Sequence, residues 1–433
     1  MDLVTRGSEP QRLHQQSGGG SADPAATTGP IRAASPSTGR LIGLDAARGL
    51  AVLGMFVAHF NPYQTFPDSM LQALVSGRSA GLFAVLAGIT TALLSGGSRP
   101  PSGLDMRERR LRIAVRAVLL FAVGLVLSAM DVSVKEILTA YGALFLLALP
   151  LLRVRPRHLA VAAAVSAVAG PVLSYALRSG VVGANGAGET MVFGNFTGPA
   201  ALGNGLLVLT VTGVYPLLTW LPFLLAGMAV GRLRLGEAAV RRRLVVAGVS
   251  LTVAAYGLSW LLMNPLGGFA RIAAATGTDV ARAREAATTA VGVVPTVHPA
   301  ALLTTASHSG APLEIAGVVG LALAIVGILL VLADRAPRVF APLTAVGRVA
   351  LSAYVGHIVV IWALGPDLIA RLFISTGYLL LVVMVVGTTG LAAVWTRWAG
   401  QGPLERPVSH LSKSAAALLI RRHRRHPENR RSR

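Results

Sequence analysis

The sequence predicts an all-α, polytopic membrane protein, a bundle of about ten transmembrane helices with both chain termini in the cytoplasm. The composition is the first observation behind this prediction. Of the 433 residues, 53% are hydrophobic and only 13% are charged, whereas charged residues make up about 25% of an ordinary soluble domain. This balance excludes a soluble globular protein. Cysteine is absent, which excludes disulfides, thiolate metal sites and a cysteine nucleophile.

Recurrent apolar segments are the second observation. A helix that crosses a hydrocarbon core of about 30 Å needs roughly 20 residues. Ten segments approach this length, and Phe193–Thr212, which Pro and Gly interrupt, is a candidate re-entrant piece. The predicted spans are Leu41–Phe60, Ser79–Leu94, Ile113–Met130, Ile137–Leu152, Leu159–Leu177, Val214–Val230, Leu244–Met263, Ile315–Ala333, Val349–Leu364 and Leu372–Trp395.

The two ends of the chain differ from the apolar segments. Residues 1–40 are rich in Gly, Ser and Pro without an apolar run, so we expect a disordered cytoplasmic tail. They do not resemble a signal peptide, because the first hydrophobic segment begins only at Leu41. The transmembrane domain is predicted at residues 41–398 and a basic cytoplasmic tail at 399–433.

The distribution of positive charge is the third observation. With a cytoplasmic amino terminus, 31 of the 39 Lys and Arg residues fall on the inner connections and seven on the outer ones, and Arg48 lies within the first span. The positive-inside rule therefore favours an even number of spans in the cell membrane. The net charge of +21 needs no nucleic acid as a partner, because the basic run 421–425 has no interleaved aromatic residues and follows a span. We expect the bilayer and its anionic lipids as partners instead.

The first predicted span carries the polar residues of greatest interest. Arg48 and His59 are eleven residues apart, so on a helix they lie about 20° from alignment and about 16 Å apart along the axis. Asp45 precedes Arg48 by three residues, a spacing that allows an intrahelical ion pair. Ionisable residues inside membranes are costly and mark functional sites. The alternative is that Asp45 and Arg48 anchor the helix at the interface and His59 caps its outer end.

The first span resembles the first helix of membrane-bound acyltransferases of the acyltransferase-3 type and of the related heparan-α-glucosaminide N-acetyltransferases. The resemblance rests on the pattern Leu44-Asp-x-x-Arg-Gly-x-Ala51 followed by His59. Over most of the remaining chain, the sequence resembles the YeiB-like bacterial branch of that superfamily. The stretches that carry this second resemblance are 77–88, 215–227, 308–312, 347–354 and 402–405.

The resemblance implies transfer of an acyl group, usually acetyl, from cytoplasmic coenzyme A to a sugar or other acceptor at the outer face. By matching positions, His59 is the implied catalytic histidine and Arg48 a charged partner on the donor side. Imidazole serves either as a base or as a nucleophile in such chemistry, and arginines suit the phosphates of acyl-CoA. The expected partners are a glycan or lipid-linked acceptor, with a homo-oligomer left open.

Further candidates lie on the acceptor side. Arg78 opens the second span near His59 and suits a developing oxyanion, or else anchors the helix. The resemblance adds His308 as an acceptor-side residue or second base. Glu314 begins the eighth span, where it orients a histidine or complements the helix dipole. Tyr354 and His357 share one face of the ninth span, and bundle packing is the alternative to a place on the substrate path.

We expect no metal, because His298 and His308 are ten residues apart without a carboxylate set. Two other classes compete with the enzyme. A small-molecule transporter also explains intramembrane charges, although the chain has no evident internal repeat. A structural membrane protein leaves Asp45, Arg48 and His59 unexplained.

Overall fold

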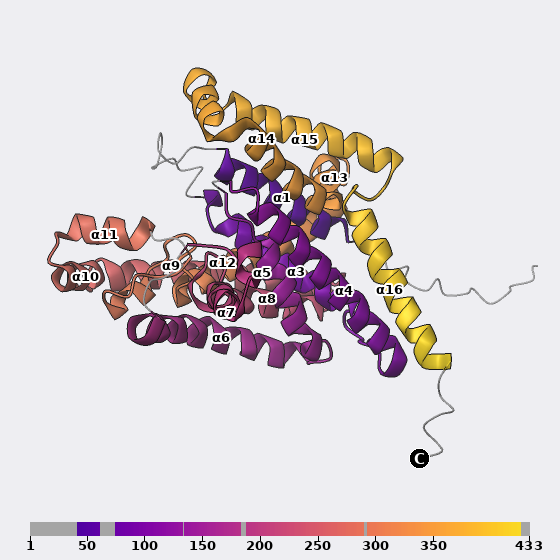
Figure 1. The fold of residues 1–433 in the computed structure, drawn as a ribbon, viewed down its shortest axis with the longest axis horizontal. Coiled ribbons are helices and arrows are strands. Elements are labelled where there is room, and N and C mark those ends of the chain that lie inside the picture. Colours follow the sequence, from indigo (N-terminus) through magenta and orange to yellow (C-terminus); the bar gives the residue numbers. More distant parts are fainter. Residues whose placement is uncertain (1–40, 61–73, 133, 183–187, 290–291, 426–433) are drawn as a thin grey trace, which may run out of the picture. The chain divides into compact units, whose positions relative to one another are not determined.

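The protein is a bundle of helices, seen in a computed structural model that describes residues 41–60, 74–132, 134–182, 188–289 and 292–425 (Figure 1). This part of the chain contains no strand. The predicted tail at 1–40 and the last eight residues lie outside it. The longer helices are α1 (Ile42–His59), α3 (Arg78–Leu94), α4 (Gly103–Ser128), α5 (Leu138–Ala148), α6 (Pro156–Leu177), α8 (Leu217–Gly231), α9 (Ala238–Met263), α12 (Pro312–Arg335), α14 (Ala350–Thr376), α15 (Leu379–Trp398) and α16 (Glu405–Arg425).

Shorter helices and turns connect these elements. They are η1 (Leu149–Leu151), η2 (Arg178–Val182), η3 (Phe193–Phe196), α7 (Pro199–Leu207), η4 (Val208–Thr212), α10 (Gly268–Thr276), α11 (Val280–Thr289), η5 (Pro299–Leu303) and α13 (Ala341–Arg348). The long connection between α9 and α12 contains α10, α11 and η5, which share a second hydrophobic cluster that includes Phe269, Ile272 and Ala301.

The ten predicted apolar segments are largely helical, although Ile137–Leu152 comprises α5 and η1 and Leu372–Trp395 covers the end of α14 and most of α15. In the described residues, seven helices are long and apolar enough to cross a membrane, namely α1, α4, α6, α9, α12, α14 and α15. The pair α7–η4 and α8 passes the same test together, with a bend of 56° between its halves, and makes an eighth candidate. α3 and α5 with η1 are shorter apolar helices. The prediction of a multi-pass membrane protein is confirmed, whereas the number of ten spans stays a prediction.

One predicted span has the wrong boundary. The segment Leu372–Trp395 is not continuous, because α14 ends at Thr376 and α15 begins at Leu379. Gly377 between them has a φ of 59°, a left-handed conformation that ends helices and that glycine adopts without steric cost. The apolar residues continue on both sides of this turn, so hydropathy alone does not reveal it. α14 is itself kinked at Gly365, next to Pro366.

Glycines allow the central helices to approach closely. A Cβ atom at Gly88 of α3 would overlap the carbonyl oxygen of Leu224 in α8, and one at Gly227 of α8 would overlap the carbonyl oxygen of Val85 in α3. Small residues at crossings are the usual means by which helices pack inside a bilayer, where van der Waals contact replaces the hydrophobic driving force. α1 contacts α3, α12 and α13, and 12 of its 18 residues are buried.

Arg232, at the carboxyl end of α8, forms hydrogen bonds with the carboxyl ends of two other helices. Its guanidinium donates hydrogen bonds to the carbonyl oxygens of Ala92 (3.0 Å) and Gly97 (2.8 Å), to Ser95 Oγ (2.8 Å) and to the carbonyl oxygen of Leu152. The carboxyl ends of α3, α5–η1 and α8 therefore meet at one point, where a cation complements the unpaired carbonyls and the helix dipoles.

Candidate functional site

A pair of histidines joins α1 to α14. His59, the last residue of α1, and His357, in the first half of α14, share a hydrogen bond of 2.8 Å between Nδ1 of His59 and Nε2 of His357. The two rings are stacked, with an interplanar angle of 12°. His357 is only 1% exposed. In this hydrogen bond one ring nitrogen donates and the other accepts. If both rings were doubly protonated, both nitrogens would be donors and the bond would be lost.

Aromatic side chains hold the His357 ring. Phe56 stacks on it with ring centroids 4.8 Å apart, and Tyr354 meets it edge-on at 5.1 Å. The Tyr354 hydroxyl in turn accepts a hydrogen bond of 3.1 Å from the backbone N–H of Ile137, at the start of α5. Residues of α1, of α14 and of the start of α5 therefore fix the position of the His357 imidazole. His59 thus has a rigidly held hydrogen-bond partner.

His308 lies beside this pair, in the loop before α12. Its Nε2 atom accepts a hydrogen bond of 3.0 Å from the backbone N–H of Gly77, the residue before α3. Its backbone has a φ of 60°, a conformation that few residues other than glycine adopt. Burial and the nearby Arg78 guanidinium lower the pKa of His308 from 6.5 to about 4. The ring also interacts electrostatically with His59.

Arg78, the first residue of α3, extends the same cluster. Its guanidinium donates to the backbone oxygen of Ser76 (3.3 Å) and to Ser307 Oγ (3.4 Å), and it lies over the ring of Tyr256 at 5.3 Å. Glu314, at the start of α12, is 4% exposed and interacts with this cation. The predicted acceptor-side residues Arg78, His308, Glu314, Tyr354 and His357 are thus linked to His59, directly or through one another, and we call these six residues the histidine cluster.

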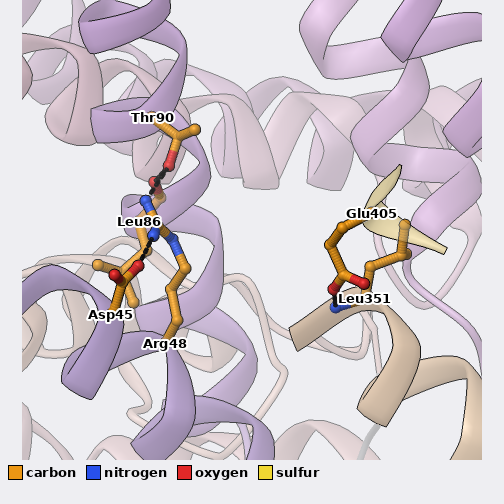
Figure 2. Close-up of polar contacts among 6 residues, drawn as sticks. All are labelled: Asp45, Arg48, Leu86, Thr90, Leu351 and Glu405. Atoms are coloured by element: carbon orange, nitrogen blue, oxygen red, sulfur yellow. Dashed lines mark hydrogen bonds and ion pairs between the residues drawn. The ribbon is translucent and has the colours of Figure 1, made fainter. Parts of the chain in front are cut away.

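Arg48 lies at the opposite part of α1. Its Nη1 atom is 2.6 Å from Oδ1 of Asp45, and its Nη2 atom donates to Thr90 Oγ1 at 2.8 Å (Figure 2). The Thr90 hydroxyl donates onward to the carbonyl oxygen of Leu86 (2.7 Å). The carboxylate of Asp45 is nearly buried, whereas the Arg48 side chain is 23% exposed. The predicted intrahelical ion pair is present, and it leaves part of the Arg48 side chain accessible.

Two further charges adjoin this pair. Arg116 of α4 interacts electrostatically with Arg48 and with Glu405. Glu405, the first residue of α16, accepts hydrogen bonds from the backbone N–H groups of Leu351 (2.7 Å) and Ser352 (3.2 Å) and from Ser352 Oγ (2.5 Å), as Figure 2 shows in part. Its carboxylate caps the amino-terminal turn of α14, where the helix dipole favours a negative charge. We call Asp45, Arg48, Thr90, Arg116 and Glu405 the charged cluster.

Apolar side chains separate the two clusters along α1. On the helix face that carries Arg48 and His59, helical geometry places Val52 and Met55 between them. Val52 is 0% and Met55 4% exposed. A ligand that reaches from the charged cluster to the histidine cluster therefore has to displace or bypass this apolar layer.

Sequence reasoning missed four of the residues above. Thr90 lies in a predicted span, so its hydroxyl was a signal, but an intrahelical bond to the backbone satisfies most such hydroxyls. Arg116 is one of several arginines in residues 107–116 of α4, and Glu405 lies in a motif that hydropathy does not single out. Glu136, just before α5, is 3% exposed and accepts bonds from Thr139 and Ser128. Burial raises its pKa.

Possible metal ligands are sparse in the helices and loops that the structure describes. No three His, Asp or Glu side chains there are grouped as a metal site would require. The histidine cluster contains imidazoles from three elements, and the contacts described for them are hydrogen bonds, ring contacts and electrostatic interactions within the protein.

Fold and geometry together define a class, that of a multi-pass membrane protein with a hydrogen-bonded histidine pair at one end of its first helix and an arginine ion pair at the other. Comparison with known families agrees. Residues 40–266 match the family described as heparan-alpha-glucosaminide N-acetyltransferase, catalytic, and this match covers more than half of the chain. The protein therefore belongs to that family. Residues 283–412 match a family described only as a protein of unknown function, DUF418.

These matches confirm the resemblance predicted from the sequence. No curated protein matches the chain. The histidine cluster draws on both matched regions, since His59 and Arg78 come from the first and His308, Glu314, Tyr354 and His357 from the second. The region of unknown function thus supplies the side chain that holds His59.

Proposed function

We propose that this protein is a membrane-embedded acyltransferase. It moves an acyl group, acetyl in the first instance, from cytoplasmic acyl-CoA to a hydroxyl or amine of an extracytoplasmic glycan or lipid-linked acceptor. The observation that carries the proposal is the hydrogen-bonded pair of His59 and His357, in a chain whose matched family is named for acetyl transfer to a glucosaminide.

The donor binds at the charged cluster. Coenzyme A carries several phosphates, and Arg48 and Arg116 provide two positive charges close to each other. Asp45 and Glu405 balance these charges when no donor is bound, and the phosphates of a bound donor add further partners for both guanidinium groups. The thioester at the far end of the donor then has to pass Val52 and Met55, so we expect binding to be coupled to a local movement of α1 or of its neighbours.

His59 acts as a general base in the transfer. With His357 accepting from the Nδ1–H of His59, the Nε2 atom of His59 keeps a lone pair. That atom takes the proton of the acceptor hydroxyl or amine while the acceptor attacks the thioester carbonyl. A C–O or C–N bond forms, the C–S bond breaks, and the imidazolium returns its proton to the coenzyme A thiolate. His357 is a positioning residue, because it fixes the tautomer and the orientation of His59.

The orientation in the cell membrane follows from the charge distribution. Both termini lie in the cytoplasm, and the basic connections contact anionic lipids. The chain has no cysteine, so single cysteines report the topology without background. A Gly236→Cys variant, in the connection after α8, reacts with a membrane-impermeant maleimide only after permeabilisation, whereas Ala281→Cys in α11 reacts on intact cells.

Purified protein in detergent tests the activity directly. Radiolabelled acetyl-CoA is supplied with methyl glucosaminide as the test acceptor, and acetyl transfer is followed together with the release of thiol. Because the protein contributes no thiol of its own, released coenzyme A is measured without correction. The wild type is expected to transfer acetyl. His59→Ala is expected to lose about 10³-fold in rate, at the upper part of the range for a general base.

The control is His158→Gln, which changes an exposed histidine on α6. Wild-type rates in His59→Ala, at unchanged melting temperature, would refute the role of His59. A burst of one equivalent of thiol in the absence of acceptor would show that His59 acts as a nucleophile, with an acyl-histidine intermediate in place of direct transfer.

A second candidate function is a small-molecule transporter. The bent pair of α7–η4 and α8 favours it, because broken helices form the substrate sites of many transporters. Acetyl-CoA raises the melting temperature of an acyltransferase with a donor site. No shift with acetyl-CoA or longer acyl-CoA would favour the transporter.

A further inference from the structure

The imidazole of His308 has one nitrogen with a partner and one without. Nε2 accepts from the backbone N–H of Gly77 at 3.0 Å. The Nδ1 atom is buried and has no hydrogen-bond partner in the part of the chain that the structure describes. A buried polar atom without a partner is costly, and native proteins retain few of them. Such an atom beside a catalytic candidate indicates a place for a ligand.

The contact with Gly77 determines which nitrogen carries the proton. A backbone N–H donates and never accepts, so Nε2 must present a lone pair. A neutral His308 then carries its proton on Nδ1. The neutral form is the relevant one at pH 7, since burial and Arg78 hold the pKa of His308 at about 4. The unpartnered atom is therefore a donor, fixed in place by a backbone contact on its other side.

The surroundings of this donor suit an oxygen that gains negative charge. The guanidinium of Arg78 bonds to Ser307 Oγ, one residue before His308, and acts electrostatically on the imidazole. The ring of Tyr215 meets His308 edge-on, with centroids 6.0 Å apart. His308 also interacts with His59. The other titratable groups linked to His308 include Glu314 and Tyr256, through Arg78, and His357, through His59.

The backbone of His308 has a conformation that is unfavourable for a residue other than glycine. It is one of two non-glycine residues with positive φ in the described ranges. Left-handed backbone in a residue other than glycine is costly and persists where the surroundings over-determine it, often at functional sites. Here it accompanies a ring whose Nε2 atom contacts Gly77 and which also interacts electrostatically with His59.

We propose that the Nδ1–H group of His308 donates a hydrogen bond to the acyl carbonyl oxygen during transfer, and that His308 is not a second base. This inference rests on the proposed function. As the acceptor attacks, the carbonyl oxygen becomes an oxyanion, and a pre-oriented donor next to the Arg78 charge stabilises it without reorganisation. A neutral imidazole is suited to this task, because it gives a hydrogen bond without giving up its proton.

Two substitutions separate the donor from the contact with Gly77. In His308→Asn, the side-chain amide reaches the position of Nδ1 and retains a donor there, but it does not reach Gly77. In His308→Gln, the amide reaches the position of Nε2 and can accept from Gly77, but it leaves no donor at the Nδ1 position. We expect His308→Gln to keep the wild-type melting temperature and to lose about 10²-fold in kcat with KM for acetyl-CoA nearly unchanged.

His308→Asn is expected to melt at a lower temperature and to retain kcat within about 10-fold, because the donor remains. His158→Gln serves as the control. Wild-type kcat in His308→Gln would overturn the proposal, and so would a large loss of kcat in His308→Asn beside a small one in His308→Gln, since that pattern shows a purely structural contact.

A measurement without turnover tests the tautomer. In protein labelled with ¹⁵N-histidine, the His308 signals, assigned by their absence in His308→Gln, are expected to show the Nδ1–H form from pH 6 to 8. An Nε2–H or cationic form in that range would overturn the inference. Failure of the proposed function is distinct, because it appears as absence of acetyl transfer in the wild type itself, and it overturns the acyl-oxygen assignment whatever the tautomer.

Discussion

The two ends of α1 hold polar side chains of opposite character. In the charged cluster, Arg48 pairs with Asp45 at 2.6 Å and carries a permanent positive charge. In the histidine cluster, His59 and His357 share one hydrogen bond, and His308 is neutral at pH 7. Permanent charge suits the binding of an anion, whereas imidazoles that share protons suit proton transfer. Under the proposed function, α1 therefore has a donor-binding end and a reactive end, with Val52 and Met55 between them.

The contact between His59 and His357 is the most sensitive test of the reactive end. His357→Phe fills the same space but cannot accept from His59, so the tautomer of the base is no longer fixed. We expect kcat to fall by about 10³-fold, as for the loss of other groups that orient a catalytic histidine. His357→Gln retains an acceptor near the position of Nε2 and is expected to stay within about 10-fold of the wild type.

The separation of the two clusters also predicts that the His357 variants change kcat and not the binding of acetyl-CoA. Because Arg48 lies about 16 Å from His59 along α1, neither His357 variant is expected to alter the shift in melting temperature that acetyl-CoA causes. A lost shift in His357→Phe would mean that the two clusters form one site and would break the division of α1 into two ends.

This contact shows where sequence reasoning stops. The alignment of Arg48 and His59 follows from helical periodicity within one segment, and the ion pair of Asp45 with Arg48 follows from a spacing of three. His59 and His357 are 298 positions apart in the sequence, and Gly77 and His308 are 231 apart. No local pattern encodes such pairings, because they depend on which helices pack together. The helices themselves were predictable from hydropathy, whereas the turn at Gly377 was hidden by apolar residues on both sides.

The acid stability of the reactive end is the next largest effect. The folded protein holds the pKa of His308 at about 4, below its ordinary value of 6.5. The unfolded chain therefore binds this proton at a higher pH than the folded one. The free energy of unfolding is therefore unaffected by the titration of His308 above pH 6.5. It decreases as the pH falls toward 4, by about 3 kcal/mol in total.

Unfolding curves from pH 4 to 8 measure this effect as a difference between variants. His308→Gln lacks the titrating group and is expected to lose less stability on acidification than the wild type. The His158→Gln control is expected to follow the wild type. Equal slopes for His308→Gln and the wild type would show that His308 is not held neutral by the fold.

The ion pair at the binding end gives a smaller effect on stability. Arg48→Gln removes the partner of a nearly buried carboxylate, at a cost of about 2 kcal/mol, below the range for fully buried pairs because Arg48 is 23% exposed. The double variant Asp45→Asn with Arg48→Gln is expected to recover part of this loss. Both are expected to lose the acetyl-CoA shift in melting temperature. If acetyl-CoA still raised the melting temperature of the double variant, the donor site would not include Arg48.

Glu405 allows a further test of the binding end. Its negative charge lies there and repels an anionic donor. Its carboxylate caps α14 through Leu351 and Ser352, so Glu405→Gln is expected to lower stability by about 1 kcal/mol. The same change removes a negative charge beside Arg116, so the affinity for coenzyme A is expected to rise a few-fold at low salt and less at high salt. Calorimetric titration with coenzyme A at two ionic strengths measures both the gain and its screening. Weaker binding in Glu405→Gln would show that the cap of α14 shapes the donor site more than its charge does, and that the binding end depends on geometry as strictly as the reactive end.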